Sequence, residues 1–221
     1  MAFVVPIGVD ISDGISIIST GLLGESDFPT LKYYTSIGPV FIQHWDDQDI
    51  SIIPYVEGCN LVKSQLPSIP LSVPEEHKRF GYQFYGVLCA LKHVRTTHVI
   101  RTRNDEWFTN FDCMVELFQK DTKRIISSSM LWSYEYRSHI GDHVFIAETE
   151  LLLSAYKALW MAVQNGQTFT FEDHPSPECE LFRAFVNASQ AKYPLNRKEY
   201  LIDRCDVIPM TSMGEYLTRY H

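Results

Sequence analysis

Short apolar runs alternate with segments of helical periodicity along this chain, and this alternation is the feature that most limits its fold. Residues 75–94 predict the clearest helix, because their apolar positions recur at the helical period. These positions are Phe80, Phe84, Val87, Leu88 and Leu91. An apolar strand is expected soon afterwards, over 98–102. Strands that alternate with helices predict an α/β fold with a mixed, mainly parallel central sheet flanked by helices on both faces.

The same patterns predict the other elements. Further strands are expected over 15–19, 39–43, 50–54 and 123–129, with a short apolar segment over 144–147. Further helices are expected over 27–36, 112–119 and 150–163, with a last one from Ser176. Residues 57–74 are rich in Pro, Ser and Gly and predict a loop. No long linker divides the 221 residues, so we expect one domain.

Composition and charge exclude several classes of protein. A hydrophobic fraction of 45% and a charged fraction of 21% are typical of a folded domain. The formal net charge of −8 argues against a binder of nucleic acid polymers, which needs a basic face. The five cysteines are scattered without a CxxC pair, which favours reduced thiols over disulfides or a zinc knuckle. Because the sequence shows neither a basic leader nor a long apolar span, we expect a soluble, cytoplasmic protein without a membrane span.

The segment HVIRTRNDEWF, residues 98–108, carries the strongest chemical signal. Its apolar run delivers Arg101, Arg103 and Asp105 to a strand end, and ligands of α/β sheets bind beyond the carboxyl ends of strands. Asp105 can supply a hard oxygen ligand for Mg²⁺ or Mn²⁺, and both guanidinium groups can bind phosphate oxygens. This combination predicts a nucleotide-bearing substrate. The alternative is a strand end whose charges form solvated ion pairs of little energetic weight.

The segment RSHIGDHVFIA, residues 137–147, is the second candidate. His139, Asp142 and His143 lie close together beside Gly141, which lets the backbone approach a ligand. Such a group could hold a metal, act as a catalytic base or contact a sugar hydroxyl or a phosphate. The alternative is a turn that Asp142 caps, with two exposed histidines.

The segment HPSPECELF, residues 174–182, predicts a helix start and a further acid. Ser176 is a suitable N-cap, and Glu178 falls in the first turn, where the helix dipole favours a carboxylate. Capping alone would explain this pattern. A catalytic or substrate-orienting role for Glu178 is the other interpretation.

Residues at the ends of the first two expected strands could contact a nucleotide. Trp45 could stack on a base or sugar, or it could fill the core. Asp46 or Asp47 could accept hydrogen bonds from a base or a ribose hydroxyl. The candidates after the first strand are Ser19, Thr20 and Gly21. The chain has no P-loop, GxGxxG or GxSxG motif, so the sequence indicates neither an ATPase, a dinucleotide enzyme nor a serine hydrolase.

Taken in order, these segments resemble the WavE-type lipopolysaccharide-synthesis proteins, a group of glycosyltransferases with the GT-A fold. The resemblance covers about 15–186 and depends on the order and spacing of short motifs. These motifs are ISIISTG, PVFIQHW, RTRND, IGDHVFIA and SPECELF. The resemblance implies a Rossmann-like GT-A domain.

The same resemblance implies a hexosyltransferase-like enzyme. It would move a sugar from a nucleoside-diphosphate sugar, here a UDP-sugar, to a glycan acceptor in surface polysaccharide, lipopolysaccharide or glycoprotein glycan synthesis. Residues of about 1–110 would bind the nucleotide, and residues of about 111–221 would hold the acceptor and the catalytic groups. Peripheral association with a glycan-assembly complex would fit this role.

The resemblance also assigns functional residues. A DxD-like element binds Mn²⁺ or Mg²⁺ in GT-A enzymes; Asp105 matches its final acid, whereas Arg103 stands in place of the first. A cation at the leaving diphosphate, either a metal held by Asp105 or the Arg103 guanidinium, would lower the barrier. If the reaction inverts the anomeric centre, a base must take the proton of the acceptor hydroxyl. The candidates are Asp142, His143 and Glu178.

Two other functions stay open on the sequence. One is a metal-dependent hydrolase that uses the cluster of His139, Asp142 and His143. The other is a non-catalytic domain that binds a sugar nucleotide.

Overall fold

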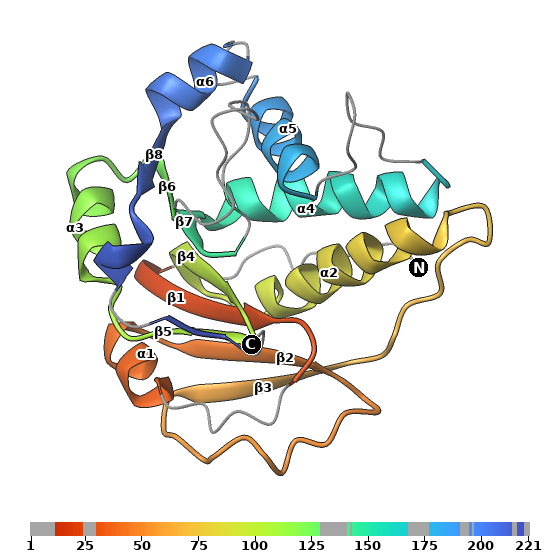
Figure 1. The fold of residues 1–221 in the computed structure, drawn as a ribbon, viewed down its shortest axis with the longest axis horizontal. Helices are drawn as coiled ribbons and strands as arrows, with labels where there is room; N and C mark the ends of the chain where they lie inside the picture. The colour runs from red at the N-terminus through yellow and green to blue at the C-terminus, as the bar shows by residue number, and fades with distance from the viewer. Residues whose placement is uncertain are drawn as a thin grey trace.

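Seven strands in the described part of the chain form a mixed sheet at the centre of the protein (Figure 1). This computed structural model describes residues 12–23, 30–128, 141, 143–167, 177–190, 195, 197–213 and 216–218. The strands, from one edge to the other, are β3 (Cys59–Ser64), β2 (Val40–Trp45), β1 (Ser12–Thr20), β4 (Thr96–Arg103), β7 (Phe145–Glu148), β6 (Ile125–Ser128) and β8 (Cys205–Ile208). β7 runs antiparallel to β4 and β6, and the other neighbouring pairs in this sheet are parallel. The predicted α/β fold with a mixed, mainly parallel sheet is confirmed.

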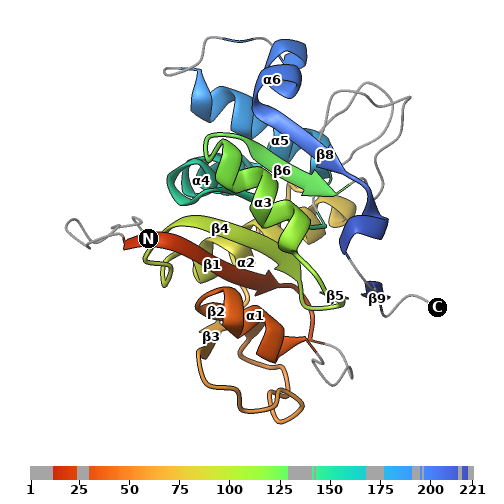
Figure 2. The same cartoon turned by 90° about the vertical axis from the view of Figure 1, so that its left-hand side faces the viewer.

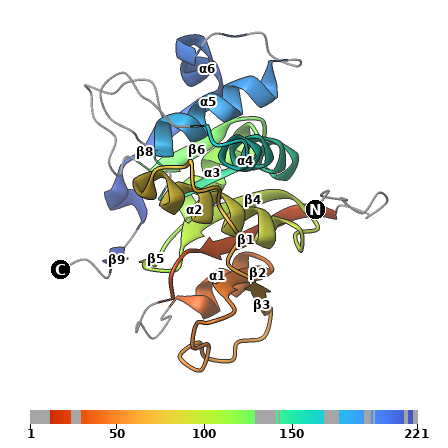
Figure 3. The same ribbon diagram turned by 90° about the vertical axis from the view of Figure 1, so that its right-hand side faces the viewer.

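Helices cover both faces of this sheet, as Figures 2 and 3 show from opposite sides. On one face lie α2 (Glu75–Leu91) and α4 (Thr149–Gln164), and α5 (Pro177–Ser189) packs against α4. On the other face lie α1 (Leu31–Ile37) and α3 (Asp112–Lys120). We call these two sides of the sheet the α2 face and the α3 face.

Each face has its own hydrophobic cluster, and the strands contribute alternate residues to the two. In β1, Ile18 packs into the cluster of the α2 face, whereas Ile17 packs into the cluster of the α3 face. In β4, Val99 and Ile100 divide in the same way. Successive side chains of a strand point to opposite sides of the sheet, so sequence parity decides which face a strand residue serves.

The C-terminal region completes the sheet. α6 (Arg197–Arg204) leads into β8 at the sheet edge, and a 3-10 helix, η2 (Met210–Met213), follows. A separate two-stranded sheet pairs β5 (Glu106–Phe108) with β9 (Tyr216–Thr218). This pairing brings residues 216–218 beside the segment that follows β4.

Some expected elements are wrong or shifted. Residues 50–54 form turns rather than a strand, and the strand is instead β3, within the segment expected to be a loop. β3 is an edge strand that exposes Leu61 and Lys63, so it lacks the apolar run that marks a buried strand. The helix expected over 27–36 begins only at Leu31, and residues 24–29 lie outside the described part. α6 and β8 were not expected, and the sequence of α6 is largely polar.

One glycine explains how α1 connects to the sheet. At Gly38, which ends α1, a Cβ atom would collide with the backbone carbonyl of Ile15 in β1. Only a residue without a side chain allows the helix end to approach the strand this closely. None of the described helices is long and apolar enough to cross a membrane.

Candidate functional site

β1, β2 and β4 run in the same direction, so their carboxyl ends meet at one edge of the sheet. In Figure 3 the β1 arrow points left, toward β5. The register places Thr20 opposite Arg103, the last residues of β1 and β4. The residues predicted at the ends of these three strands therefore come together, although up to about eighty residues separate them in the chain.

A pocket of about 540 Å³ lies at this edge, between the strand ends and α2. Six of the eight residues predicted to bind the donor or a metal line it: Thr20, Gly21, Trp45, Arg101, Arg103 and Asp105. We call it the strand-end pocket. Its other lining residues are Leu22, Asp47, Gln48, Leu66, Arg79, Tyr82, Gln83 and Gly86.

Strand parity explains which predicted residues reach the pocket. Thr20 follows Ile18 by two residues and lies on the α2 face, whereas Ser19 is fully buried with the opposite parity. Arg101 and Arg103 follow Val99 on the α2 face by the same rule. The side chain of Ser19 is therefore not among those that line the pocket.

At the end of β2, the acid in the pocket is Asp47 rather than Asp46. Asp46 is exposed, and its backbone N–H donates to the Ser64 carbonyl at 2.9 Å, which continues the pairing of β2 with β3. Asp47, one residue later in the turn, lines the pocket. The sequence interpretation allowed either acid.

Asp105 and Arg103 form a bidentate pair inside the pocket. Arg103 Nε donates to one carboxylate oxygen of Asp105 and Nη2 to the other, both at 2.9 Å. Burial by itself raises the pKa of the Asp105 carboxyl, but the hydrogen bonds and charge of Arg103, with a contribution from Arg101, lower it below the ordinary value of 3.8. Asp105 is therefore an anion at neutral pH, as a metal ligand must be.

Asn104 fastens the three strand ends to one another. Its side-chain amide donates to the carbonyls of Gly21 (2.9 Å) and Gln43 (2.8 Å), and its backbone N–H donates to the Thr20 carbonyl at 2.9 Å. The residue is fully buried. Asn104 therefore fixes the spacing between β1, β2 and the Arg103–Asp105 pair, a role that the sequence did not reveal.

Glu106 connects the two segments with the strongest sequence signals. Its Oε1 lies 2.5 Å from Nδ1 of His143 and 3.6 Å from Nε of Arg103, and its side chain is 1% exposed. Because a carboxylate only accepts hydrogen bonds, the His143 ring donates through Nδ1. The predicted catalytic residue His143 is thus buried and is held one side chain away from the pocket wall.

The hydroxyl of Thr20, a residue 2% exposed, lines the pocket and is buried without a hydrogen-bond partner among the described residues. The amide of Gln43, a residue with no exposed surface, lies behind Gly86 and likewise has no partner among them. An unsatisfied buried polar group costs about 1–3 kcal/mol, so it is rare unless a ligand or water completes it. The Thr20 hydroxyl lies in the pocket lining, where a polar ligand can reach it.

Aromatic residues form one wall of the pocket. The Trp45 ring is parallel to the Tyr85 ring, with 6.5 Å between the ring centroids, and it makes an edge contact with Tyr82, with 6.4 Å between the centroids. Trp45 is only 5% exposed. It therefore belongs to the core and to the pocket lining at once. At Gly86 of α2 a Cβ would lie 2.8 Å from Oε1 of Gln43 and 3.7 Å from the Trp45 ring, so α2 lies close to β2 at this point.

The structure does not bring every predicted residue to the pocket. Glu178 lies in the first turn of α5, and no residue of α5 is among those that line the strand-end pocket. Asp142 and His139 lie outside the described residues. The hydrolase interpretation therefore has one of its three residues described, His143, and that histidine is buried against Glu106.

The sequence did not indicate that α2 contributes to the pocket. Arg79, Tyr82, Gln83 and Gly86 line the pocket from this helix. Their spacing of three, four and seven residues places them on one helical face, which is a signal that the sequence carried. This face of α2 lies beside the apolar stripe of the same helix. The spacing therefore predicts a shared face, but it does not indicate that this face borders a ligand site.

The described residues contain no cluster of three potential metal ligands. The pocket offers Asp105 and, from the turn after β2, Asp47 as hard oxygen donors. Mg²⁺ and similar ions are commonly held by one or two carboxylates together with substrate phosphates and water, rather than by a complete protein cage. The donor set therefore fits a cation that arrives with a phosphorylated ligand.

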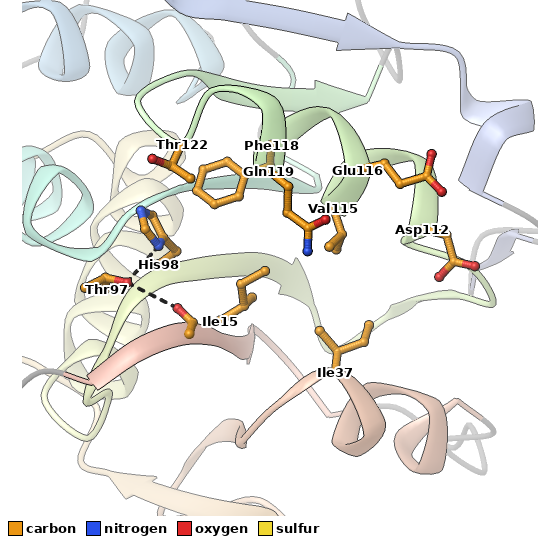
Figure 4. Close-up of a pocket in the computed structure, with 11 residues that line it drawn as sticks. Ile15, Ile37, Thr97, His98, Asp112, Val115, Glu116, Phe118, Gln119 and Thr122 are labelled. Atoms are coloured by element: carbon orange, nitrogen blue, oxygen red, sulfur yellow. Dashed lines mark hydrogen bonds between the residues drawn. The ribbon is translucent and has the colours of Figure 1, made fainter.

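A second, larger cavity of about 750 Å³ lies on the α3 face (Figure 4). It is lined from the start of β1 by Gly14 and Ile15, from β4 by Thr97 and His98, and from α3 by Val115 and Phe118 among others. The sequence signalled no chemistry there. We call it the α3-face cavity.

Comparison with known proteins supports the fold. A crystal structure of a glycosyltransferase involved in the glycosylation of the major capsid of PBCV-1 has a TM-score of 0.50 and 14% sequence identity, over 94% of this chain and 95% of that one. Glucosyl-3-phosphoglycerate synthase from Mycobacterium tuberculosis, in complex with Mn²⁺, UDP and glucosyl-3-phosphoglycerate, has a TM-score of 0.52 and 11% identity, over 95% and 73%.

These similarities show the fold, which is that of GT-A-type glycosyltransferases, as predicted. No known family model matches the chain, and no curated protein matches its sequence.

Proposed function

We propose that this protein is a glycosyltransferase that moves a sugar from a nucleoside-diphosphate sugar, a UDP-sugar, to a glycan acceptor. The observation that carries this proposal is the strand-end pocket, in which Arg101, Arg103, Asp105 and Thr20 converge. The GT-A-type fold supports it, as do the Mn²⁺ and UDP bound by the mycobacterial synthase. The pocket volume of about 540 Å³ falls in the range of small-molecule sites.

The charges around the pocket favour a donor that binds together with a divalent cation. The arginines at the pocket are Arg79, Arg101 and Arg103, and the acids are Asp47, Asp105 and, in contact with Arg103, Glu106. Their formal charges cancel. A diphosphate that entered alone would therefore add uncompensated negative charge, so we propose Mn²⁺ or Mg²⁺ as the cofactor and Asp105 as the residue that holds it.

In this proposal the predicted residues of the pocket have distinct roles. A divalent cation bound at Asp105 would stabilise the negative charge on the leaving diphosphate. Arg101 and Arg103 would bind phosphate oxygens, and Thr20 would donate its hydroxyl hydrogen to the donor. Gly21 lets the backbone approach the donor, and the wall formed by Trp45 and Tyr82 would pack against the nucleoside.

Of the three candidates Asp142, His143 and Glu178, we propose His143 as the base for the acceptor hydroxyl. The Glu106 contact favours His143, because Nδ1 donates to the carboxylate and Nε2 is then the basic nitrogen of a neutral ring. Neither His143 nor any residue of α5, the helix that carries Glu178, lines the strand-end pocket, but His143 lies only one side chain behind its wall. Asp142 remains a prediction from the sequence.

The arrangement also supports a division of labour along the chain. All residues that line the strand-end pocket fall between Thr20 and Asp105, so we propose that residues of about 1–110 bind the nucleotide. Residues of about 111–221 would then hold the acceptor. Three further proposals depend on the order of the motifs. They are membership of the WavE-type family, a role in surface polysaccharide, lipopolysaccharide or glycoprotein glycan synthesis, and association with a glycan-assembly complex.

The test is a ligand screen followed by a transfer assay. Thermal unfolding is measured with UDP, GDP, CMP and their sugars, each with and without Mn²⁺, because a ligand that binds the native state raises the melting temperature. We expect UDP with Mn²⁺ to give the largest rise. UDP release from UDP-sugars is then measured over a panel of glycan acceptors. If no nucleotide raises the melting temperature, the proposed function is wrong.

A further inference from the structure

Two neighbouring carboxylates lie within reach of one guanidinium group. Arg103 Nε donates to Asp105 at 2.9 Å and also lies 3.6 Å from Oε1 of Glu106. Asp105 lines the strand-end pocket, whereas Glu106 is buried behind Arg103 with 1% of its side chain exposed. A small movement of the guanidinium would therefore exchange one carboxylate for the other.

Glu106 has spare capacity to accept a hydrogen bond. Its Oε1 is already held by His143 at 2.5 Å, but its Oε2 is buried and has no hydrogen-bond partner among the described residues. A buried carboxylate oxygen without a donor is costly, and such a group in a native structure calls for an explanation. His143 holds the carboxylate through Oε1, the oxygen that also lies 3.6 Å from Nε of Arg103, so the carboxylate is fixed beside the guanidinium.

Asp105 cannot coordinate a cation with either oxygen unhindered while Arg103 is hydrogen-bonded to both of them. A guanidinium and a divalent cation that share one carboxylate repel each other, and the repulsion is stronger in a partly buried pocket than in water. Binding of a cation therefore displaces the guanidinium, which then needs a carboxylate on the protein side in addition to the phosphate oxygens of the donor. Glu106 is the acid that the structure places there.

We propose that Glu106 is a positioning residue that receives Arg103 when Asp105 turns to a divalent cation. This inference rests on the proposed function, since it assumes that Asp105 binds the cation of a nucleotide complex. Glu106 acts through Arg103 and touches neither donor nor cation. The Arg103–Asp105 pair is then the resting arrangement of the pocket, and the Arg103–Glu106 pair is the arrangement with cation bound.

The test measures Mn²⁺ binding directly, through the electron paramagnetic resonance signal of free Mn²⁺ with UDP present. Glu106→Gln keeps the shape of the side chain and removes its charge. We expect it to raise the Kd for Mn²⁺ about tenfold, which is the loss of affinity that usually follows the loss of one hydrogen bond to a charged group. Glu116→Gln is the matched control, because Glu116 is an exposed acid at the α3-face cavity. The control should bind Mn²⁺ as the wild type does.

A double-mutant cycle separates positioning from a general effect on structure. In the Arg103→Gln variant no guanidinium has to move, so adding Glu106→Gln should change the Kd for Mn²⁺ by less than about twofold. An equal tenfold loss in both backgrounds would overturn the proposal, as would a wild-type Kd in Glu106→Gln alone.

A second variant covers the case in which Glu106→Gln does not fold. Glu106→Asp keeps the charge but withdraws the carboxylate by one methylene, and we expect a smaller rise in the Kd for Mn²⁺, of about threefold. A wild-type Kd in this variant would also overturn the proposal. If the wild-type protein binds neither UDP nor Mn²⁺, the proposed function itself is wrong. If the wild type binds both, the results with these variants test the role of Glu106 alone.

Discussion

The α3-face cavity and the strand-end pocket differ in size and in the side chains that line them. The α3-face cavity is the larger, at about 750 Å³, and contains residues from the beginnings of β1 and β4. The strand-end pocket, at about 540 Å³, contains residues from the ends of the same two strands. Three arginines and two aspartates line the pocket, whereas Asp112, Glu116 and His98 are the titratable residues of the cavity.

This difference shows that strand direction, rather than volume, decides where charged and polar side chains gather in this fold. The loops that follow parallel strands share one edge of the sheet, so polar side chains placed after several strands meet there. Residues at the strand beginnings, such as Ile15 and Thr97, pack beneath α3 instead. The comparison predicts that substitutions in the pocket affect donor binding and that matched substitutions in the cavity do not.

The largest effect is expected from Asp105→Asn, compared with Asp112→Asn in the α3-face cavity. Loss of the proposed cation ligand should lower the rate of sugar transfer by at least about a hundredfold, the usual loss when one group that stabilises charge in a transition state is removed. Asp112→Asn should leave the rate unchanged. UDP release with Mn²⁺ measures both, and equal rates for wild type and Asp105→Asn would remove Asp105 from the site.

The next effect concerns stability and its dependence on pH. Because the folded pKa of Asp105 is lowered, its carboxylate stabilises the protein above about pH 4 and loses that contribution as the pH falls through the folded pKa. Arg103→Gln removes the main cause of the lowered pKa and should cost about 1.5 kcal/mol at neutral pH. Urea unfolding at about pH 7 and about pH 3 should show that this difference shrinks in acid.

A difference that persisted unchanged at low pH would mean that Arg103 stabilises the protein by packing and not by its charge. Thr122, an exposed residue at the α3-face cavity, offers a control site, and Thr122→Ser should show the wild-type pH profile.

A smaller effect should separate the two faces of β1. Thr20→Val removes a buried hydroxyl that has no partner among the described residues, so the free energy of unfolding should stay the same or rise. UDP affinity should fall about fivefold, which is the weight of one hydrogen bond. Ser19→Ala removes a similarly buried hydroxyl with the opposite strand parity and should leave UDP affinity unchanged. Isothermal calorimetry with UDP and Mn²⁺ measures both, and equal losses would contradict the parity argument.

The smallest effect is expected from filling the α3-face cavity. Val115→Ile adds one methylene to its lining and should change the free energy of unfolding by no more than about 0.5 kcal/mol. UDP affinity should remain that of the wild type. A measurable change in UDP affinity would show that the two ends of the sheet are coupled.

The sequence predicted the parts of the fold that periodicity marks. The apolar stripe over 75–94 became α2, and the run before RTRND became β4. β3 and β8 lie next to single neighbours at the two sheet edges, and α6 is largely polar, so their sequences carry little of the apolar signal of a buried element. Their places were decided by pairing with β2 and β6, which a local pattern does not contain.

The candidate site divides in the same way. Arg101, Arg103 and Asp105 were predicted because their chemistry follows directly on a strand, and Thr20 and Trp45 because they follow strands as well. Asn104 and Glu106 lie within the same segment, yet their importance depends on partners far along the chain, Gln43 for the first and His143 for the second. Only the folded structure shows those partners.

The elements with clear hydrophobic periodicity, such as α2 and β4, and the residue types at the strand ends are determined by the local sequence, because hydrophobic periodicity and strand parity act over a few residues. The tertiary structure alone decided which strand ends share an edge, which face of α2 closes the pocket and which buried carboxylate lies behind Arg103. These features depend on the packing of residues that are distant in sequence, so no single segment determines them.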